Sequence, residues 1–283
     1  MQTLHYLTDP VLAPIFWPPV ATAFAVAVMC SLVSVLVVLK RLAFVGQGIS
    51  HAALGGVGVA VALGLVGAGI SQATGQFLVV LAFCLGSALL IGAMSEKGKT
   101  EGDTAIGVVL VASMSLGALL LHKFSTSTVS WESFLFGSIN DVGWRDAAIA
   151  GAAALGTLVT LWLARRPLVF WAFDAQVAQA VGVRSALMKL LLMTVLALAT
   201  VVTMKLAGVV LATAMLVLPG AAALRVSNRW ARVLALAMVF GILGIVGGLV
   251  LSFEFDWLPG ASIVLTLTAV FGACWGIGRL ASG

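Results

Sequence analysis

Two polar residues stand out in an apolar segment near residues 42–66, which is long enough to cross a membrane. Gln47 and His51 are four positions apart, so a helix would place them on one face. Neutral imidazole binds zinc and other first-row transition ions, and an ionisable residue within a membrane span is a candidate functional residue. The same spacing also fits a histidine that is hydrogen-bonded to a neighbouring helix. The residues themselves leave both interpretations open.

Other catalytic patterns are missing from the sequence. It has no HExxH, GxSxG or glycine-rich dinucleotide motif. Residues 92–100, GAMSEKGKT, resemble a phosphate-binding loop, but five residues separate the glycines instead of four, and an apolar helix precedes them. We therefore expect a chain that is not an enzyme and does not hydrolyse ATP by itself. We also expect Cys30, Cys84 and Cys274, which lie far apart in apolar stretches, to be buried apolar residues.

The composition is that of a membrane protein. Of 283 residues, 62% are hydrophobic and only 9% are charged, with a mean hydropathy of +1.18. A soluble domain carries about 25% charged residues. These values exclude a soluble globular protein, a disordered chain, a secreted disulfide scaffold and a nucleic-acid binder. A chain of this composition needs the lipid bilayer as its surroundings.

Long Ala-, Leu- and Gly-rich runs predict an all-α, polytopic helix bundle rather than a β-barrel. We expect about nine spans, near 17–39, 42–66, 75–95, 104–122, 144–164, 186–204, 207–224, 230–252 and 258–280. Only a short polar break at Lys205 separates the sixth span from the seventh, so eight spans are possible, and these two could form a tight hairpin or partly broken helices. The chain has 31 glycines, many of them inside spans, which predicts close packing of helices.

The basic residues predict the orientation. If the spans alternate, the connections on one side hold three basic residues: Lys123, Arg145 and Lys205. The other side holds twelve: Lys40, Arg41, Lys97, Lys99, Arg165, Arg166, Arg184, Lys189, Arg225, Arg229, Arg232 and Arg279. Positive loops stay in the cytoplasm. We therefore expect the N-terminus outside and the C-terminus inside.

Two connections are long. The outer one, 123–143, has an apolar centre at 134–136 that suggests a short interfacial helix. The inner one, 165–185, predicts a short helix in which Asp174 is the N-cap and Gly182 is the C-terminal stop. Such a cytoplasmic helix is a natural docking surface for a soluble partner.

Four blocks of sequence resemble the permease subunits of the bacterial ABC-3 family, which belong to zinc- and manganese-importing ABC transporters. They are RLAFVGQGISHAALGG, SFLFGSINDV, FWAFDAQVAQAVGVR and LAGVVLATAMLVLPGAAALRVS, at residues 41–56, 133–142, 170–184 and 206–227. The blocks occur in the family's order and extend over nearly the whole chain.

The resemblance implies a type II ABC importer-like permease that forms a single transmembrane domain over 1–283. It implies a bacterial cytoplasmic membrane location, a second permease copy as a homodimer, cytoplasmic ATP-binding subunits that use the ATP, and an extracytoplasmic solute-binding protein. A coupling helix near 171–185 would contact the ATPase through Phe173, Asp174, Ala178 and Gly182. The chain itself would bind no cofactor.

The family motif also implies an aspartate and a histidine along a metal path. His51 matches the histidine, whereas Gln47 occupies the aspartate position. Hard ions such as Mn²⁺ prefer carboxylate oxygen, and imidazole suits zinc. We therefore expect a divalent metal at His51 and Gln47, zinc before manganese or iron.

Three alternatives remain. The same type of permease could carry a metal chelate, a siderophore or a cobalamin-like cargo if Gln47 widens the path. An ion-driven secondary transporter would need carboxylates buried within its spans, and the sequence places none there with clarity. A membrane-embedded enzyme would need a titratable cluster that the sequence lacks.

Overall fold

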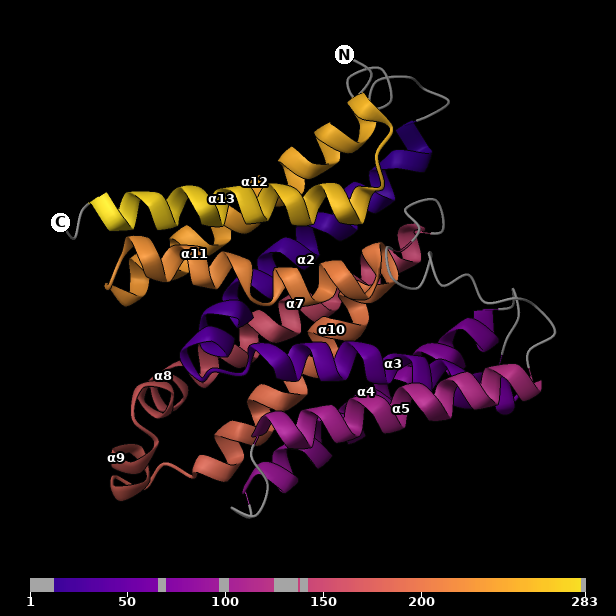
Figure 1. Cartoon of the computed structure of the whole chain (residues 1–283), viewed down its shortest axis with the longest axis horizontal. Coiled ribbons are helices and arrows are strands. Elements are labelled where there is room, and N and C mark those ends of the chain that lie inside the picture. The colour runs from indigo at the N-terminus through magenta and orange to yellow at the C-terminus, as the bar shows by residue number, and fades with distance from the viewer. Residues whose placement is uncertain (1–12, 66–69, 97–101, 125–136, 138–141, 281–283) are drawn as a thin grey trace. The chain divides into compact units, whose positions relative to one another are not determined.

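The computed structural model describes residues 13–65, 70–96, 102–124, 137 and 142–280. Within these residues the chain forms helices and no strand (Figure 1). The helices are α2 (Ala13–Leu39), α3 (Ala43–Ala62), α4 (Ile70–Glu96), α5 (Gly102–Phe124), α7 (Trp144–Leu163), α8 (Arg165–Phe173), α9 (Ala175–Ala180), α10 (Ser185–Met215), α11 (Leu218–Val226), α12 (Trp230–Phe255) and α13 (Pro259–Leu280). The predicted all-α architecture is confirmed.

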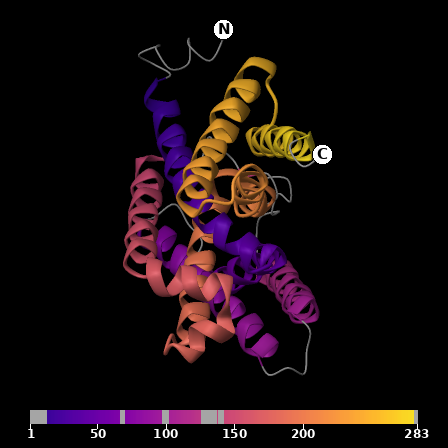
Figure 2. The ribbon, with the colours of Figure 1, turned by 90° about the vertical axis from the view of Figure 1, so that its left-hand side faces the viewer.

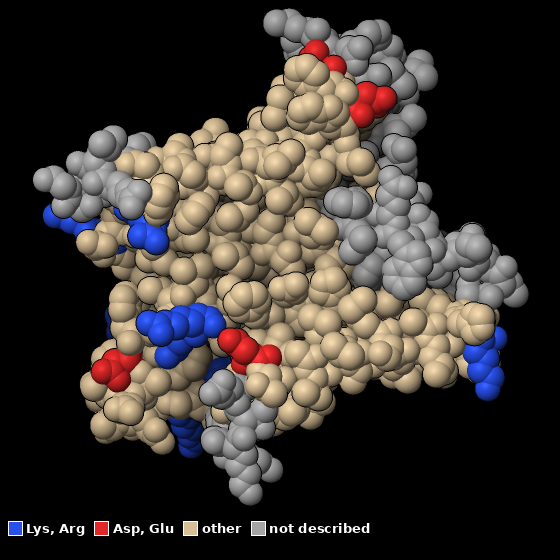
Figure 3. All heavy atoms as spheres, viewed as in Figure 1, with Lys and Arg blue, Asp and Glu red and all other residues tan. Residues whose placement is uncertain are grey.

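Nine segments of the described residues are long and apolar enough to cross a membrane. They run over Phe16–Leu39, Ala43–Ala62, Gln72–Ser95, Gly102–Phe124, Trp144–Leu163, Ser185–Met204, Gly208–Val226, Trp230–Phe255 and Pro259–Gly276. Each overlaps one of the nine spans expected from the sequence. On the face drawn in Figure 3, charged side chains lie near helix ends, and uncharged side chains cover the helix flanks.

The sixth and seventh spans are not a simple hairpin with a loop at Lys205. Helical structure continues past Lys205 as α10, and Gly208 within it has a φ of +73°. A left-handed residue cannot continue a right-handed helix, so the regular helix is interrupted at Gly208. A second interruption, at Leu216 and Val217, precedes α11, where Pro219 occupies the first turn. Of the two arrangements expected from the sequence, partly broken helices fit the structure and a tight hairpin at Lys205 does not.

The chain divides into two compact units. One contains Met1–Ala43, Glu132–Val183 and Val202–Gly283, and the other contains Phe44–Trp131 and Arg184–Val201. The first part of α10 therefore belongs to one unit and its end to the other. The single permease domain over 1–283 stays a prediction.

In the first unit, α2 packs against α7, α11 and α12, and α13 packs against α11 and α12 (Figure 2). Glycines make these contacts close. A Cβ on Gly220 of α11 would lie 2.5 Å from the backbone carbon of Ser34, and a Cβ on Gly248 of α12 would overlap Ile263. Small residues let helix backbones approach where lipid offers no hydrophobic drive to associate. The proline–glycine pair of the fourth sequence block therefore serves to seat α11 on α2.

In the second unit, α3 packs on α4 and α5 by the same means. A Cβ on Gly56 would lie 2.9 Å from the Cα of Val80, and Gly58 faces Gly117 of α5 equally closely. The first part of α10 is attached to α4 by a hydrogen bond in which Lys189 Nζ donates to the Gly92 carbonyl at 2.7 Å. The predicted role in close helix packing holds for these glycines in both units, but not for Gly272 and Gly276 of α13, where a Cβ would meet no atom within 4 Å.

Candidate functional site

The first two turns of α3 carry an exposed stripe formed by Phe44, Gln47 and His51. Phe44 is 61% exposed, Gln47 is exposed, and His51 is half-buried. Further along the helix the stripe ends, because Leu54 and Gly58 are buried. The structure thus places Gln47 and His51 on one face, as their spacing predicts.

The neighbouring residues of the motif point elsewhere. Ser50 is fully buried, and its hydroxyl donates to the Gln47 carbonyl at 3.0 Å. Gly48 is also buried, and a Cβ there would lie 2.9 Å from the Ile106 side chain of α5. The serine and the glycine therefore shape and seat the helix, and Gln47 and His51 are the polar side chains of the motif within α3 that are not fully buried.

One nitrogen of His51 lacks a partner. Nδ1 is buried and has no hydrogen bond to the described residues. Leaving a buried polar atom unpaired costs free energy, about 1–3 kcal/mol for a typical group. In a neutral imidazole one ring nitrogen donates and the other accepts. The described surroundings of Nδ1 therefore do not fix whether this nitrogen carries the proton.

One copy of the described chain offers few metal ligands. No group of three or more His, Cys, Asp or Glu side chains comes together among the residues that the structure describes. Cys30, Cys84 and Cys274 are all free and buried, as expected. The hydroxyl of Thr203 lies 3.2 Å from the sulfur of Cys30, and Cys84 donates to the Ile49 carbonyl at 3.6 Å. An imidazole and an amide from a single chain would hold a divalent ion only weakly.

In the first unit, the inner connection forms two short helices rather than one. They are α8 and α9, and Asp174 lies between them in extended conformation. One oxygen of Asp174, Oδ1, accepts the N–H groups of Gln176 and Val177, both at 2.9 Å. The predicted N-cap is therefore confirmed, since these bonds satisfy two of the free donors at the start of α9.

The end of α9 is equally well defined. Gly182 has a φ of +91°, its N–H donates to the Gln179 carbonyl, and the next N–H donates to the Ala178 carbonyl at 2.9 Å. These bonds form a Schellman motif, which stops a helix at a left-handed residue. Ala178 is fully buried. Asp174, Ala178 and Gly182 thus build and seat α9, and only Phe173 of the four predicted contact residues presents a large apolar side chain.

Two further apolar side chains near Phe173 are exposed. Phe173, Val177 and Val181 are spaced four apart, and their side chains are 64%, 48% and 70% exposed. We call these three residues the apolar docking face. They lie outside the candidate spans, and exposed apolar patches of this kind mark protein or membrane interaction sites. The four-residue spacing within AQVAQAV was the signal in the sequence that could have identified the two valines.

The two short helices are also attached to the first span. Lys40 follows the last residue of α2, and its Nζ lies 4.0 Å from the ring centroid of Trp171, which is almost fully buried in α8. Partial burial lowers the pKa of Lys40 below the ordinary range of a lysine, and the nearby charge of Asp174 acts in the opposite direction. This link between α2 and α8 was not foreseen from the sequence.

Two sequence patterns fall mainly on residues outside the described ranges. The expected interfacial helix at 134–136 and most of the second sequence block lie there. The pattern at 92–100 lies partly there. At its start, Gly92 is helical in α4, not in a loop, and its carbonyl accepts the bond from Lys189.

Comparisons with known proteins extend over nearly the whole chain. The manganese transport system membrane protein MntC of Halalkalibacterium halodurans is 33% identical over 275 residues, which cover 96% of this chain and 90% of that protein. MntB of Synechocystis, of the same description, is 32% identical over 94% of this chain and 84% of its own length. A probable iron transport system membrane protein of Haemophilus influenzae is 29% identical over 94% of both chains.

Two solved structures share the architecture. The first, PsaBC from Streptococcus pneumoniae in complex with Fab, matches with a TM-score of 0.81 at 28% identity, over 96% of this chain and 94% of that one. An inward-facing putative metal-chelate type ABC transporter matches with a TM-score of 0.70 over 94% and 89% of the two chains, and at 18% identity it shares the fold alone. The family model described as the ABC 3 transport family matches residues 14–275. The chain therefore belongs to the ABC 3 transport family and is a multi-pass membrane permease.

Proposed function

We propose that this permease is the membrane-spanning subunit of an ATP-driven importer that moves a divalent transition metal into the bacterial cytoplasm. The observation that carries the proposal is the family match over residues 14–275, together with relatives whose names describe manganese or iron transport. Gln47 and His51, which we call the polar stripe on α3, are the part of this chain that would meet the metal.

Manganese is the first cargo to test. The relatives described above are named for manganese or iron, and none of them for zinc. The sequence predicts zinc because Gln47 occupies the position of the family's aspartate. An amide oxygen is nevertheless a hard ligand like a carboxylate oxygen, although it is uncharged. The zinc preference is therefore one outcome of the uptake experiment below.

A second copy of the chain would complete the metal site. One chain contributes only His51 and Gln47 to the stripe, so two symmetry-related chains would supply two imidazoles and two amides. A closed two-fold interface presents the same residues from both subunits. Four weak ligands suit transport, because a transported ion must bind and leave again.

The apolar docking face would contact the partner ATPase. Exposed apolar side chains on and beside a short helix can insert into a groove of a soluble subunit, here Val177 on α9 with Phe173 and Val181 beside its two ends. Movement of that subunit would then pass through Trp171 and Lys40 into α2. An extracytoplasmic binding protein would deliver the metal on the opposite side of the membrane.

This assignment requires the N-terminus outside and the C-terminus inside, so that α8 and α9 face the cytoplasm. The native cysteines are buried and would give little background in a labelling experiment. Cysteine introduced at exposed Gln179 should be protected from an impermeant maleimide in intact cells, and cysteine at exposed Lys123 should be labelled. The reverse pattern would contradict the orientation.

The function is tested by reconstitution. The permease is co-expressed with the ATPase and binding-protein genes nearest to its own, and uptake of Mn²⁺, Zn²⁺, Fe²⁺ and a ferric chelate is measured with and without ATP. We expect ATP-dependent uptake of a free divalent ion. Uptake of the chelate alone would favour the chelate alternative, and ATP-independent uptake driven by an ion gradient would favour a secondary transporter.

A further inference from the structure

A groove in the first unit lies where several helix ends meet. It has a volume of about 390 Å³, within the range of about 300–1,000 Å³ that ligand sites occupy. Its lining residues come from α2, α7, α8 and α12: Leu32, Leu36, Leu158, Leu161, Trp162, Arg165, Leu168, Val169, Trp230, Ala231 and Leu234. Of these eleven side chains, Arg165 is the one that carries a charge.

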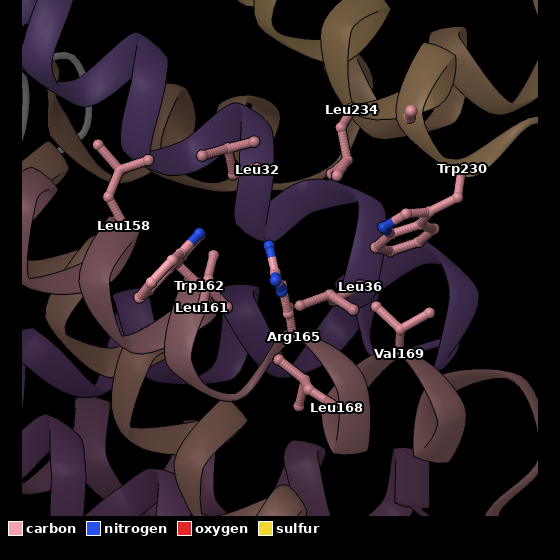
Figure 4. A pocket seen from close by; sticks show the side chains of 11 residues that line it. Leu32, Leu36, Leu158, Leu161, Trp162, Arg165, Leu168, Val169, Trp230 and Leu234 are labelled. Atoms are coloured by element: carbon pink, nitrogen blue, oxygen red, sulfur yellow. The ribbon is translucent and has the colours of Figure 1, made fainter.

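Arg165 points into the groove (Figure 4). Its guanidinium lies between the indole rings of Trp162 and Trp230, and the nitrogens of both indoles are on the groove side of their rings. The Arg165 Cζ is 5.3 Å from the Trp162 ring centroid. Among the residues that the structure describes, no carboxylate forms an ion pair with Arg165. One cation and two N–H donors therefore converge in an apolar setting.

The two ends of the groove differ in where they lie along the membrane spans. Arg165 and Trp230 lie at helix starts, immediately beyond the end of one span and at the beginning of another. Leu32, Leu158 and Leu234 lie within spans. Tryptophan rings prefer the membrane–water interface, and an arginine at such a boundary ordinarily extends toward water. The groove thus has a cationic end at the interface and an apolar end within the bilayer.

We propose that this groove binds an anionic phospholipid, with its phosphate on Arg165 and the two indole N–H groups, and an acyl chain along the leucines. Basic pockets between membrane helices bind anionic head groups. A free phosphate would leave the leucine wall unused, and a zwitterionic lipid would offer the guanidinium less net charge. The site is separate from the polar stripe on α3 and does not depend on the identity of the cargo.

The test compares two adjacent arginines. Arg165→Gln removes the cation from the groove, and Arg166→Gln removes an equal charge from an exposed residue that does not line it. The permease, alone or with its ATPase, is purified in mild detergent. Retained lipid is identified by native mass spectrometry, and thermal stabilisation is measured by titrating phosphatidylglycerol, phosphatidylethanolamine or inorganic phosphate.

We expect wild type and Arg166→Gln to retain phosphatidylglycerol, and Arg165→Gln to bind it about tenfold more weakly, as for the loss of one charge-assisted contact. Inorganic phosphate should not stabilise the protein. Ala231→Trp, which would fill the groove from an exposed position while keeping Arg165, should lower retention as well.

Three results would overturn the proposal. Equal losses in both arginine variants would indicate general surface charge, and equal binding of phosphatidylethanolamine by wild type would remove the role of the anion. If Arg165→Gln instead separates a dimer that wild type forms, the groove is a contact between copies of the chain. Ala231→Trp keeps the test valid if Arg165→Gln fails to fold.

Discussion

The ammonium group of Lys40 lies 4.0 Å from the centroid of the Trp171 ring, so the end of α2 rests on α8. Trp171 is almost fully buried, whereas the neighbouring docking face of Phe173, Val177 and Val181 is exposed. A partner that pushes on the exposed face would therefore press the buried residues of α8 against the first span. The contact thus joins α8 to the first span, in addition to the chain connection through Ala164 that joins α8 to α7.

The energy of this contact can be measured with a double-mutant cycle of Lys40→Met and Trp171→Leu. We expect a coupling free energy of about 0.5–1 kcal/mol, the usual size of a cation–π pair near a surface. The measurement is the free energy of unfolding in mixed micelles. Arg166→Met paired with Trp171→Leu serves as the control and should give coupling near zero. Coupling of the same size in both cycles would remove the special role of Lys40.

The lowered pKa of Lys40 predicts a pH dependence. The folded state releases the Lys40 proton at a lower pH than the unfolded state does. Between those two pKa values the unfolded state binds more protons, so this residue's contribution to stability rises with pH. We expect thermal unfolding to show this rise just below the ordinary lysine pKa, and Lys40→Met to flatten it. A stability that falls in that interval only when Lys40 is present would contradict the direction of the shift.

The apolar docking face predicts a loss of ATPase binding in the variant Val177→Ser with Val181→Ser. Full burial of one valine or leucine side chain contributes about 1.5–3 kcal/mol, so losing two half-exposed contacts should weaken the complex by about tenfold or more. Binding is measured with purified permease and ATPase in nanodiscs. The matched control, Gln176→Ser with Gln179→Ser, changes exposed polar residues of the same helix and should bind normally. Equal weakening in both variants would indicate unfolding of α9 instead.

The polar stripe on α3 predicts that metal uptake depends on His51. His51→Ala should abolish uptake while leaving ATPase binding intact, because His51 is not one of the residues of the apolar docking face. His122→Ala, at the exposed end of α5, is the control and should transport normally. Gln47→Asp should raise uptake of Mn²⁺ relative to Zn²⁺, since a carboxylate favours the harder ion. Undiminished uptake by His51→Ala would remove this histidine from the path.

Close packing of α3 on α5 predicts that Gly117→Ala is destabilising. Its new Cβ would lie 2.5 Å from the Leu54 carbonyl oxygen, which is backbone and cannot rotate away. We expect a loss of roughly 1–3 kcal/mol, as for other overpacked sites. Gly107→Ala in the same helix meets no atom within 4 Å and should keep the wild-type stability. The comparison is made by thermal unfolding of both variants, and equal melting temperatures would argue against the tight contact.

The sequence by itself determined the spans, because the length and polarity of an apolar run depend only on consecutive residues. The same holds for the helix punctuation at Asp174 and Gly182, where the cap and the stop are made by neighbours in the chain. The sequence also predicts that Gln47 and His51 lie on one face of α3, because two helical residues four positions apart share a face whatever surrounds the helix.

Only the tertiary structure decided which sides of these helices are covered. It showed that Ser50 and Ala178 are buried, that Val177 and Val181 are exposed, and that α10 continues past Lys205 to an interruption at Gly208. The contact of Lys40 with Trp171 and the groove at Arg165 join residues that are far apart in the sequence. Such contacts depend on how close two helix backbones approach, and hydropathy and spacing along one chain segment carry no information about that distance.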